Sequence, residues 1–134
     1  MVGVINIKRS ILLIDDNRAF TEVFIDYFKT YNDSGFEIIG VANNGIKAVE
    51  MIRKLQPDIV LLDISMPHFS GYNVLETIAA LHLDKQPQVV MLTGMLMHDA
   101  VQASIKLGAV GFIEKPFEMQ KVISTLSRLD TPIQ

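Results

Sequence analysis

The sequence predicts an α/β domain with a doubly wound parallel sheet built from five strand–helix units. Apolar runs of strand length alternate five times with segments whose apolar residues recur at helical spacing. The runs are continuously apolar rather than alternating, which indicates burial on both faces and a sheet between two helix layers. Right-handed crossovers between parallel strands then restrict the topology to a doubly wound (βα)5 arrangement.

The five apolar runs are the expected strands. They are SILLI at 10–14, FEIIGVA at 36–42, DIVLLDI at 58–64, PQVVMLT at 87–93 and AVGFIE at 109–114. Five strands suit the flavodoxin-like order 2-1-3-4-5, in which ligands bind at the carboxyl ends of the strands near strands 1 and 3. That edge is therefore where functional residues are expected.

Each expected helix has an apolar stripe and boundary residues. Asn17 and Asn44 are expected N-caps, Pro57 stops the second helix, Gly71 precedes the third and Gly108 ends the fourth. The stripes are Phe20, Val23, Phe24, Tyr27, Phe28 and Tyr31; Ile46, Val49, Ile52 and Leu55; Val74, Leu75, Ile78 and Leu81; the segment from Met95 to Leu107; and Met119, Val122, Ile123, Leu126 and Leu129.

Length and composition limit the possible functions. The 134 residues suffice for one domain, which we place at 9–130 after an extension at 1–8 and before a linker or chain end at 131–134. The net charge of -3 argues against non-specific electrostatic binding of nucleic acid. The sequence has no cysteine and no apolar run near the roughly 20 residues that span a bilayer, so we expect a cytoplasmic protein without membrane contact.

Charged and hydroxyl residues follow the strands that lie side by side in the predicted sheet. Asp15 and Asp16 follow the first strand, Asp63 ends the third, Thr93 ends the fourth and Lys115 follows the fifth. Because the carboxyl ends of parallel strands meet at one edge, we expect three carboxylates, one hydroxyl and one ammonium to converge there.

The charges of this set indicate a metal and an anion. Three carboxylates and one ammonium sum to -2, which a hard divalent cation neutralises; Mg2+ fits best and Mn2+ is an alternative. The hydroxyl and the ammonium can then hold an anion beside the metal, for which phosphoryl is the natural candidate. Asp63 lies between the acidic pair and the Thr93–Lys115 pair, so we choose it as the nucleophile that forms an acyl phosphate.

These residues and their spacing resemble the receiver domains of response regulators in bacterial two-component signalling. The resemblance covers about residues 9–130 and rests on IDDN (14–17), LLDISMP (61–67), MLTG (91–94) and LGAVGFIEKPF (107–117). Within this family, GVANNG, LDISMPH, QPQVVMLT and KPFEM resemble the receiver of the sporulation master regulator of spore-forming Firmicutes. The resemblance therefore implies a phosphorelay component with a transcriptional output.

The resemblance assigns roles to the site residues. Asp63 would accept phosphoryl from a phosphohistidine on a sensor histidine kinase or a phosphotransfer protein. Asp16 would bind Mg2+ directly and Asp15 mainly through water. Thr93 would hydrogen-bond the phosphoryl group, and Lys115, before a cis peptide to Pro116, would pair with it.

Further roles follow from the same resemblance. Asp63 and the Ser65 backbone carbonyl would be further Mg2+ ligands, and Ser65 and Met95 would tune the lifetime of the acyl phosphate. We expect the bulky, apolar Met95 to hinder hydrolysis and favour a long lifetime. Thr93 and Phe112 would form the conformational switch. The family often carries Asp where this chain has Ser70, a position outside the reacting set.

The fourth helix carries apolar residues around more than half of its circumference. Two-sided burial and a contact surface both explain this breadth. As a contact surface it would serve phosphorylation-dependent homodimerisation, through the fourth helix, fifth strand and fifth helix, or an output partner.

Three other functions compete with this interpretation. A flavin- or nucleotide-binding module would need a glycine-rich phosphate loop, whereas the loop after the first strand is the acidic DDNRAF. A Mg2+-dependent aspartate phosphatase of another α/β class would need a cap domain, for which 134 residues leave no room. A degenerate receiver acting only through protein interactions is the remaining alternative.

Overall fold

A computed structural model describes residues 7–31, 33–66, 68–94 and 98–129 of the chain. Strands and helices alternate as β1 Arg9–Ile14, α1 Arg18–Thr30, β2 Phe36–Ala42, α2 Gly45–Leu55, β3 Ile59–Asp63, α3 Gly71–Leu81, β4 Gln88–Thr93, α4 His98–Lys106, β5 Gly111–Glu114 and α5 Met119–Ser127. The strands form one parallel sheet in the order β2-β1-β3-β4-β5, which confirms the predicted fold class and topology.

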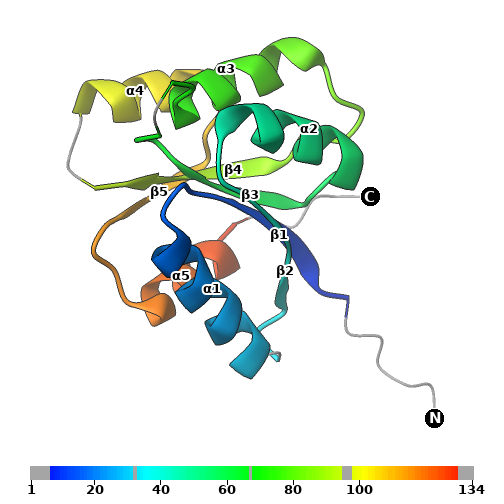
Figure 1. Ribbon diagram of the computed structural model, residues 1–134, viewed down its shortest axis with the longest axis vertical. Coiled ribbons are helices and arrows are strands. Elements are labelled where there is room, and N and C mark those ends of the chain that lie inside the picture. The colour runs from blue at the N-terminus through cyan, green and yellow to red at the C-terminus, as the bar shows by residue number, and fades with distance from the viewer. Residues whose placement is uncertain (1–6, 32, 67, 95–97, 130–134) are drawn as a thin grey trace.

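Helices cover both faces of the sheet. Figure 1 shows α2, α3 and α4 on one face and α1 and α5 on the other. The central strands β1 and β3 each pair with a neighbour on both sides. Their apolar residues are therefore covered above and below, as the unbroken apolar runs predict.

Most of the predicted helix boundaries are confirmed. The Asn17 side chain accepts a hydrogen bond from the Phe20 N–H at 3.1 Å, and the Asn44 side chain accepts one from the Lys47 N–H at 2.8 Å. Gly108 has a φ of +104°, a conformation that glycine adopts at little cost. These contacts satisfy backbone groups that a helix end leaves without partners.

Several boundaries differ from the prediction by one or two residues. Gly71 is the first residue of α3 rather than the residue before it, because Ser70 is the N-cap and forms a capping box with Asn73. Strand β5 begins at Gly111 rather than at residue 109, since the Ala109 N–H still donates to the Ser104 carbonyl at the end of α4. The predicted start of the fourth helix at Met95 lies outside the described residues and stays a prediction, and α4 is described from His98 onward.

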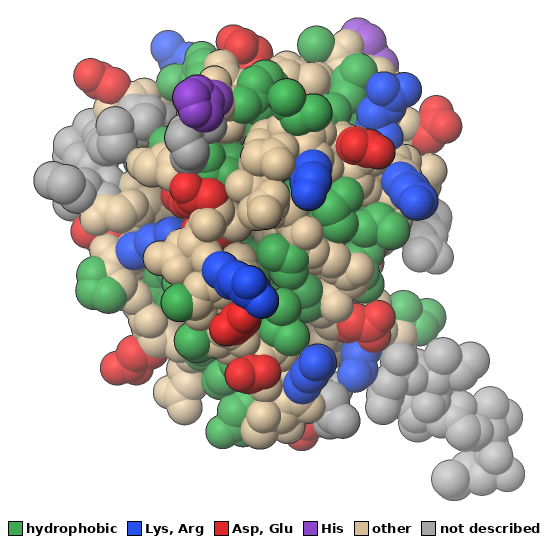
Figure 2. All heavy atoms as spheres, in the orientation of Figure 1, with side chains coloured by type: hydrophobic (Ala, Val, Ile, Leu, Met, Phe, Trp, Pro, Cys, Tyr) green, Lys and Arg blue, Asp and Glu red, His purple; other side chains and the backbone are tan. Residues whose placement is uncertain are grey.

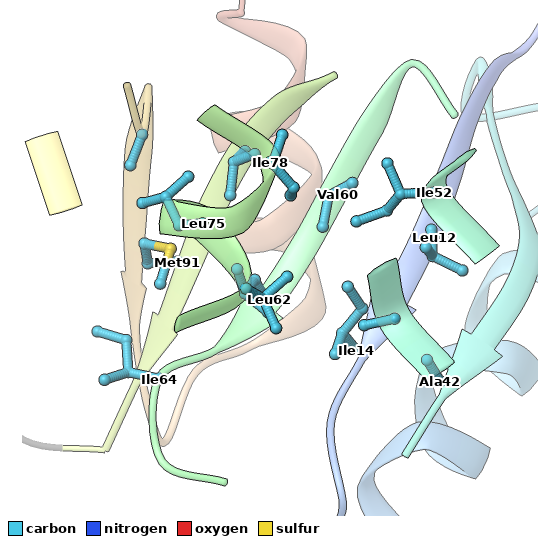
Figure 3. Packing of buried hydrophobic residues seen from close by; sticks show 14 of the residues in the cluster. Leu12, Ile14, Ala42, Ile52, Val60, Leu62, Ile64, Leu75, Ile78 and Met91 are labelled. Carbon is cyan, nitrogen blue, oxygen red and sulfur yellow. The ribbon is translucent and has the colours of Figure 1, made fainter. Parts of the chain in front are cut away.

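Two apolar clusters fill the space between the sheet and its helices. Figure 3 shows the cluster under α2 and α3, where Leu12, Ile14, Val60 and Leu62 from β1 and β3 meet Ile52, Leu75 and Ile78 from the helices. The intervening strand residues, including Ile11, Leu13, Ile59 and Leu61, pack with Phe24 and Phe28 of α1 on the opposite face. This alternation follows from the two-residue period of a strand.

Several residues of the predicted apolar stripes are exposed instead of buried, among them Leu55 at 36%. Ile46 is 73% exposed, Val23 is 59% exposed and Tyr31 is 51% exposed. At 100° per residue, Ile46 lies about 200° around α2 from buried Ala48, and therefore on the opposite side of the helix. An apolar residue near a stripe thus does not always belong to the buried face.

The surface carries charges of both signs. In Figure 2, acidic and basic side chains are interspersed over the face that is drawn, in keeping with the small net charge of -3. Among the described residues, no helix combines the length and the apolar character that crossing a membrane requires.

Candidate acidic site at the carboxyl edge of the sheet

The predicted site residues meet where adjacent strands end. Asp15 follows β1, Asp63 is the last residue of β3, Thr93 is the last residue of β4 and Lys115 follows β5. The sheet order places these four strands side by side, so residues about 100 positions apart reach one edge. Asp15, Asp63 and Thr93 are buried, whereas Asp16 is exposed.

Three carboxylates form a group that suits a hard cation. One carboxylate oxygen from each of Asp15, Asp16 and Asp63 lies within 4.8 Å of the other two. The donors are all oxygen, two of the side chains are buried, and the exposed Asp16 leaves the group open to water. Mg2+ retains several water ligands and binds through one or two carboxylates, so these residues fit it.

Lys115 pairs with two of these carboxylates. Its Nζ lies 2.8 Å from Asp15 Oδ2 and 3.7 Å from Asp63 Oδ2, so the closer partner is Asp15. Its backbone N–H donates to the Thr93 carbonyl at 2.6 Å, which ties the residue after β5 to the end of β4. The peptide bond to Pro116 is cis, as the resemblance implied.

Short backbone contacts orient the two buried carboxylates. Asp15 Oδ1 accepts a hydrogen bond from the Asn17 N–H at 2.9 Å, and Asp63 Oδ1 accepts one from the Ser65 N–H at 3.1 Å. In each case the second oxygen, Oδ2, faces Lys115. Asn17 therefore has a second role beside its predicted capping role, because its backbone holds Asp15.

The surroundings of Asp63 disfavour its charged form. They raise its pKa to about 6, first because the carboxyl group is buried and second because the charge of Asp15 repels it. The Lys115 charge and the Ser65 N–H act in the opposite direction without cancelling these effects. A divalent cation beside Asp63 would stabilise the charged carboxylate, which is the form that can act as a nucleophile.

Two residues near the site have contacts that sequence reasoning missed. A Cβ on Gly71 would lie 2.1 Å from the backbone carbonyl oxygen of Asp63, so only glycine lets α3 begin so close to β3. The Phe20 ring centroid lies 4.4 Å from Lys115 Nζ, although Phe20 was predicted only as part of an apolar stripe. Helical spacing carries no signal for such a contact, because the partner lies 95 residues away.

The remaining predicted residues lie around this centre or outside the described chain. Ser65 is exposed and reaches the site through its N–H, and its proposed carbonyl ligand role stays a prediction. Phe112 is half-buried in β5 opposite Met91 and packs against the cluster under α2 and α3. The predicted switch role of Thr93 and Phe112 stays a prediction, and Met95 lies outside the described residues.

The chain belongs to the response regulator receiver domain family, whose model matches residues 11–127. Its fold is similar to that of the Vibrio cholerae chemotaxis protein CheY4, with 25% identity, a TM-score of 0.78 and coverage of 90% of this chain and 98% of that one. The response regulator domain of Thermotoga maritima CheB is 26% identical, with a TM-score of 0.75 and coverage of 90% and 91%.

A third solved structure resembles the fold at lower identity. The receiver domain of AraT, a response regulator from Geobacillus stearothermophilus, is 22% identical, with a TM-score of 0.76 and coverage of 90% of this chain and 91% of that one. Family and fold together make this chain a receiver domain of a two-component response regulator.

Proposed function

We propose that the chain is a Mg2+-dependent phosphoacceptor in which Asp63 receives phosphoryl from a phosphohistidine. The observation that carries this proposal is the juxtaposition of three carboxylates with Lys115 at the carboxyl edge of the sheet. Receiver domains interact with histidine kinases or histidine phosphotransfer proteins, and either could be the donor here.

The chemistry is a single displacement at phosphorus. An oxygen of the Asp63 carboxylate attacks, a P–O bond forms, the P–N bond of the phosphohistidine breaks, and the imidazole nitrogen leaves with the electron pair. Asp15, Asp16, Asp63 and the Ser65 carbonyl would hold Mg2+, which when bound neutralises negative charge at the cluster.

Lys115 and Thr93 would contact the phosphoryl group after it has been transferred to Asp63. Attack turns the carboxylate of Asp63 into an acyl phosphate, which adds a phosphoryl group of about -2 charge near the Lys115 ammonium. Lys115 would move from Asp15 toward the phosphoryl oxygens, and the Thr93 hydroxyl would donate to one of them. This rearrangement at the ends of β4 and β5 would bias Phe112 and the neighbouring surface toward a second state.

The surface near α4 and β5 is our candidate for passing on the signal. Ile105 on α4 is 51% exposed and Val110, just before β5, is 49% exposed. These apolar side chains support a phosphorylation-dependent homodimer or an output contact there. Sedimentation with and without an acyl-phosphate mimic tests it: an unchanged monomer at all concentrations contradicts the homodimer.

The biological setting rests on the resemblance alone. The motifs GVANNG, LDISMPH, QPQVVMLT and KPFEM favour a sporulation phosphorelay with a transcriptional output. Met95 is our candidate for slowing hydrolysis of the acyl phosphate, and phosphate release from a Met95→Ala variant at the same rate as from the unmodified chain would contradict this.

The decisive experiment weighs the intact protein after incubation with acetyl phosphate or phosphoramidate and Mg2+. We expect one phosphoryl adduct that disappears in Asp63→Ala and when EDTA replaces Mg2+. Asp26→Ala is the matched control, because Asp26 is an exposed carboxylate on α1 and its variant should keep the adduct. If the unmodified chain forms no adduct, the alternative of a degenerate receiver that acts only by protein interaction gains support.

A further inference from the structure

The ammonium of Lys115 is shared between two buried carboxylates and one aromatic ring. Lys115 Nζ lies 2.8 Å from Asp15 Oδ2, 3.7 Å from Asp63 Oδ2 and 4.4 Å from the centroid of the Phe20 ring. The last distance is well within the roughly 6 Å over which a cation and an aromatic face attract each other. The Lys115 side chain is 25% exposed, so this attraction is only partly screened by water.

Other aromatic rings hold the Phe20 ring in place. Phe24, one turn further along α1, has its centroid 4.9 Å away, and Phe117 packs edge-on at 5.5 Å with an interplanar angle of 80°. Phe117 follows Lys115 by two residues, so both α1 and the segment after β5 contribute to this arrangement. The ring is therefore positioned by its neighbours before any phosphoryl group arrives.

A ring and a hydrogen-bond acceptor hold a lysine in different ways. A lysine side chain has many rotamers and needs several contacts to stay in one region. An oxygen acceptor would take up one N–H and fix its direction, whereas an aromatic face attracts the ammonium without doing so. Over the Phe20 ring, the ammonium can still donate its N–H groups to carboxylate oxygens. It can therefore shift between Asp15 and Asp63.

We propose that Phe20 is a positioning residue for Lys115, whose ring keeps the ammonium within reach of both Asp15 and the phosphoryl group formed on Asp63. This inference rests on the proposed function of Asp63 and adds a residue to it. The expected loss without the ring is that of one partly exposed cation–π contact, about 0.5 to 2 kcal/mol, or roughly a 2- to 30-fold slower phosphorylation.

The first test is spectroscopic and needs no phosphorylation. In the NMR spectrum of the unmodified protein, the ε-methylene protons of Lys115 should be displaced to high field relative to the exposed lysines, because the Phe20 ring current shields them. Phe20→Leu should abolish this displacement. Tyr27→Leu is the matched control, since it removes another ring from α1 and should leave the displacement unchanged; absence of the displacement in the unmodified protein overturns the proposal.

The second test measures the rate of adduct formation with acetyl phosphate and Mg2+, a small donor that needs no docking surface. Phe20→Leu should react about 2- to 30-fold more slowly, and Tyr27→Leu at the unmodified rate. Phe20→Tyr and Phe20→Trp should restore the rate, since both keep an aromatic face, and a cavity of about 460 Å³ beside Phe20 leaves room for the larger ring.

The outcomes separate this inference from the proposed function. If the unmodified chain forms no adduct, the proposed function fails, and the NMR comparison still decides whether Phe20 positions Lys115. If the adduct forms and Phe20→Leu reacts at the unmodified rate, the positioning role is wrong. If Leu, Tyr and Trp at this position all slow the reaction equally, Phe20 acts by packing alone and the proposal is again overturned.

Discussion

At the residue scale, the chemistry of the site depends on how the surrounding residues change the pKa of one carboxyl group, that of Asp63. Asp63 is 5% exposed and close to Asp15, and its pKa is raised to about 6. The ordinary value is 3.8. The folded protein therefore favours the protonated form of Asp63. The contribution of this carboxyl group to the free energy of unfolding is present below pH 4 and is lost as the pH rises through about 6.

This shift leads to a prediction on stability and pH. In EDTA, the free energy of unfolding should fall by roughly 1 to 2 kcal/mol between pH 4 and pH 7 because of Asp63, after a discount for water at the open rim. The measurement is urea unfolding of the unmodified chain and of Asp63→Asn at each pH. The difference between the two proteins isolates Asp63 from other titrating groups, and a difference that does not change with pH would contradict the prediction.

The two carboxylates beside Asp63, those of Asp15 and Asp16, contribute unequally to the contacts that hold the folded structure. Asp15 is 1% exposed, accepts the Asn17 N–H and pairs with Lys115, so its removal would take the closer carboxylate from Lys115 and the side-chain acceptor from the Asn17 N–H. Asp16 is exposed, so we expect its removal to disturb the folded protein less. Asp16 is therefore the better residue at which to separate metal binding from folding.

At the element scale, the site depends on how closely α3 approaches β3. The Gly71 N–H donates to the Ile64 carbonyl at 3.1 Å, and the Ser70–Asn73 capping box starts the helix at this point. The Asp63 carbonyl oxygen occupies the space where a Cβ on Gly71 would lie. The position of Asp63 at the end of its strand and the start of α3 are thus coupled through one glycine.

We predict that Gly71→Ala destabilises the protein by roughly 1 to 3 kcal/mol, as overpacking of a close contact does. Helix propensity alone predicts the opposite sign, since alanine is favoured over glycine by about 1 kcal/mol in a helix. Gly94→Ala is the control, because a Cβ there meets no atom of the described residues within 4 Å. Urea unfolding of both variants decides, and a Gly71→Ala protein as stable as Gly94→Ala would show that the backbone relaxes freely.

At the scale of the whole molecule, the two ends of the sheet differ in how far their carboxylate charges are neutralised. At the amino end of the strands, Asp58 Oδ2 accepts hydrogen bonds from the backbone and the hydroxyl of Ser10, and Asp58 Oδ1 pairs with Lys85 at 2.6 Å. There the carboxylate is neutralised by its neighbours. At the carboxyl end, three carboxylates lie close together and two of them, Asp15 and Asp63, pair with Lys115, so the remaining negative charge is available for a cation.

A whole-molecule prediction follows from this charge imbalance. Mg2+ should stabilise the folded chain, by about 2.7 kcal/mol when its concentration is 100 times its dissociation constant, because the unfolded chain lacks the assembled site. Thermal unfolding with increasing Mg2+ at pH 7.5 measures this. Asp16→Ala should weaken the stabilisation strongly, and the exposed-carboxylate variant Asp26→Ala should retain it; equal responses would argue against a site at this edge.

The sequence by itself determined the layered fold and most of the site. Continuous apolar runs such as DIVLLDI specify strands buried on both faces, and the handedness of crossovers then leaves few topologies. Because parallel strands end at one edge, Asp15, Asp63, Thr93 and Lys115 could be placed together without coordinates. Asn17 and Asn44 could be predicted as caps because capping is a local contact.

Only the tertiary structure decided the contacts between residues that no local pattern relates. Lys115 lies nearer to Asp15 than to Asp63 and over the Phe20 ring, and Gly71 borders the Asp63 carbonyl. The physical reason is that periodicity specifies which face of an element is buried, whereas the partner across a gap depends on how separate elements pack. Ångström-scale distances between those elements set the pKa of Asp63 and the position of its lysine.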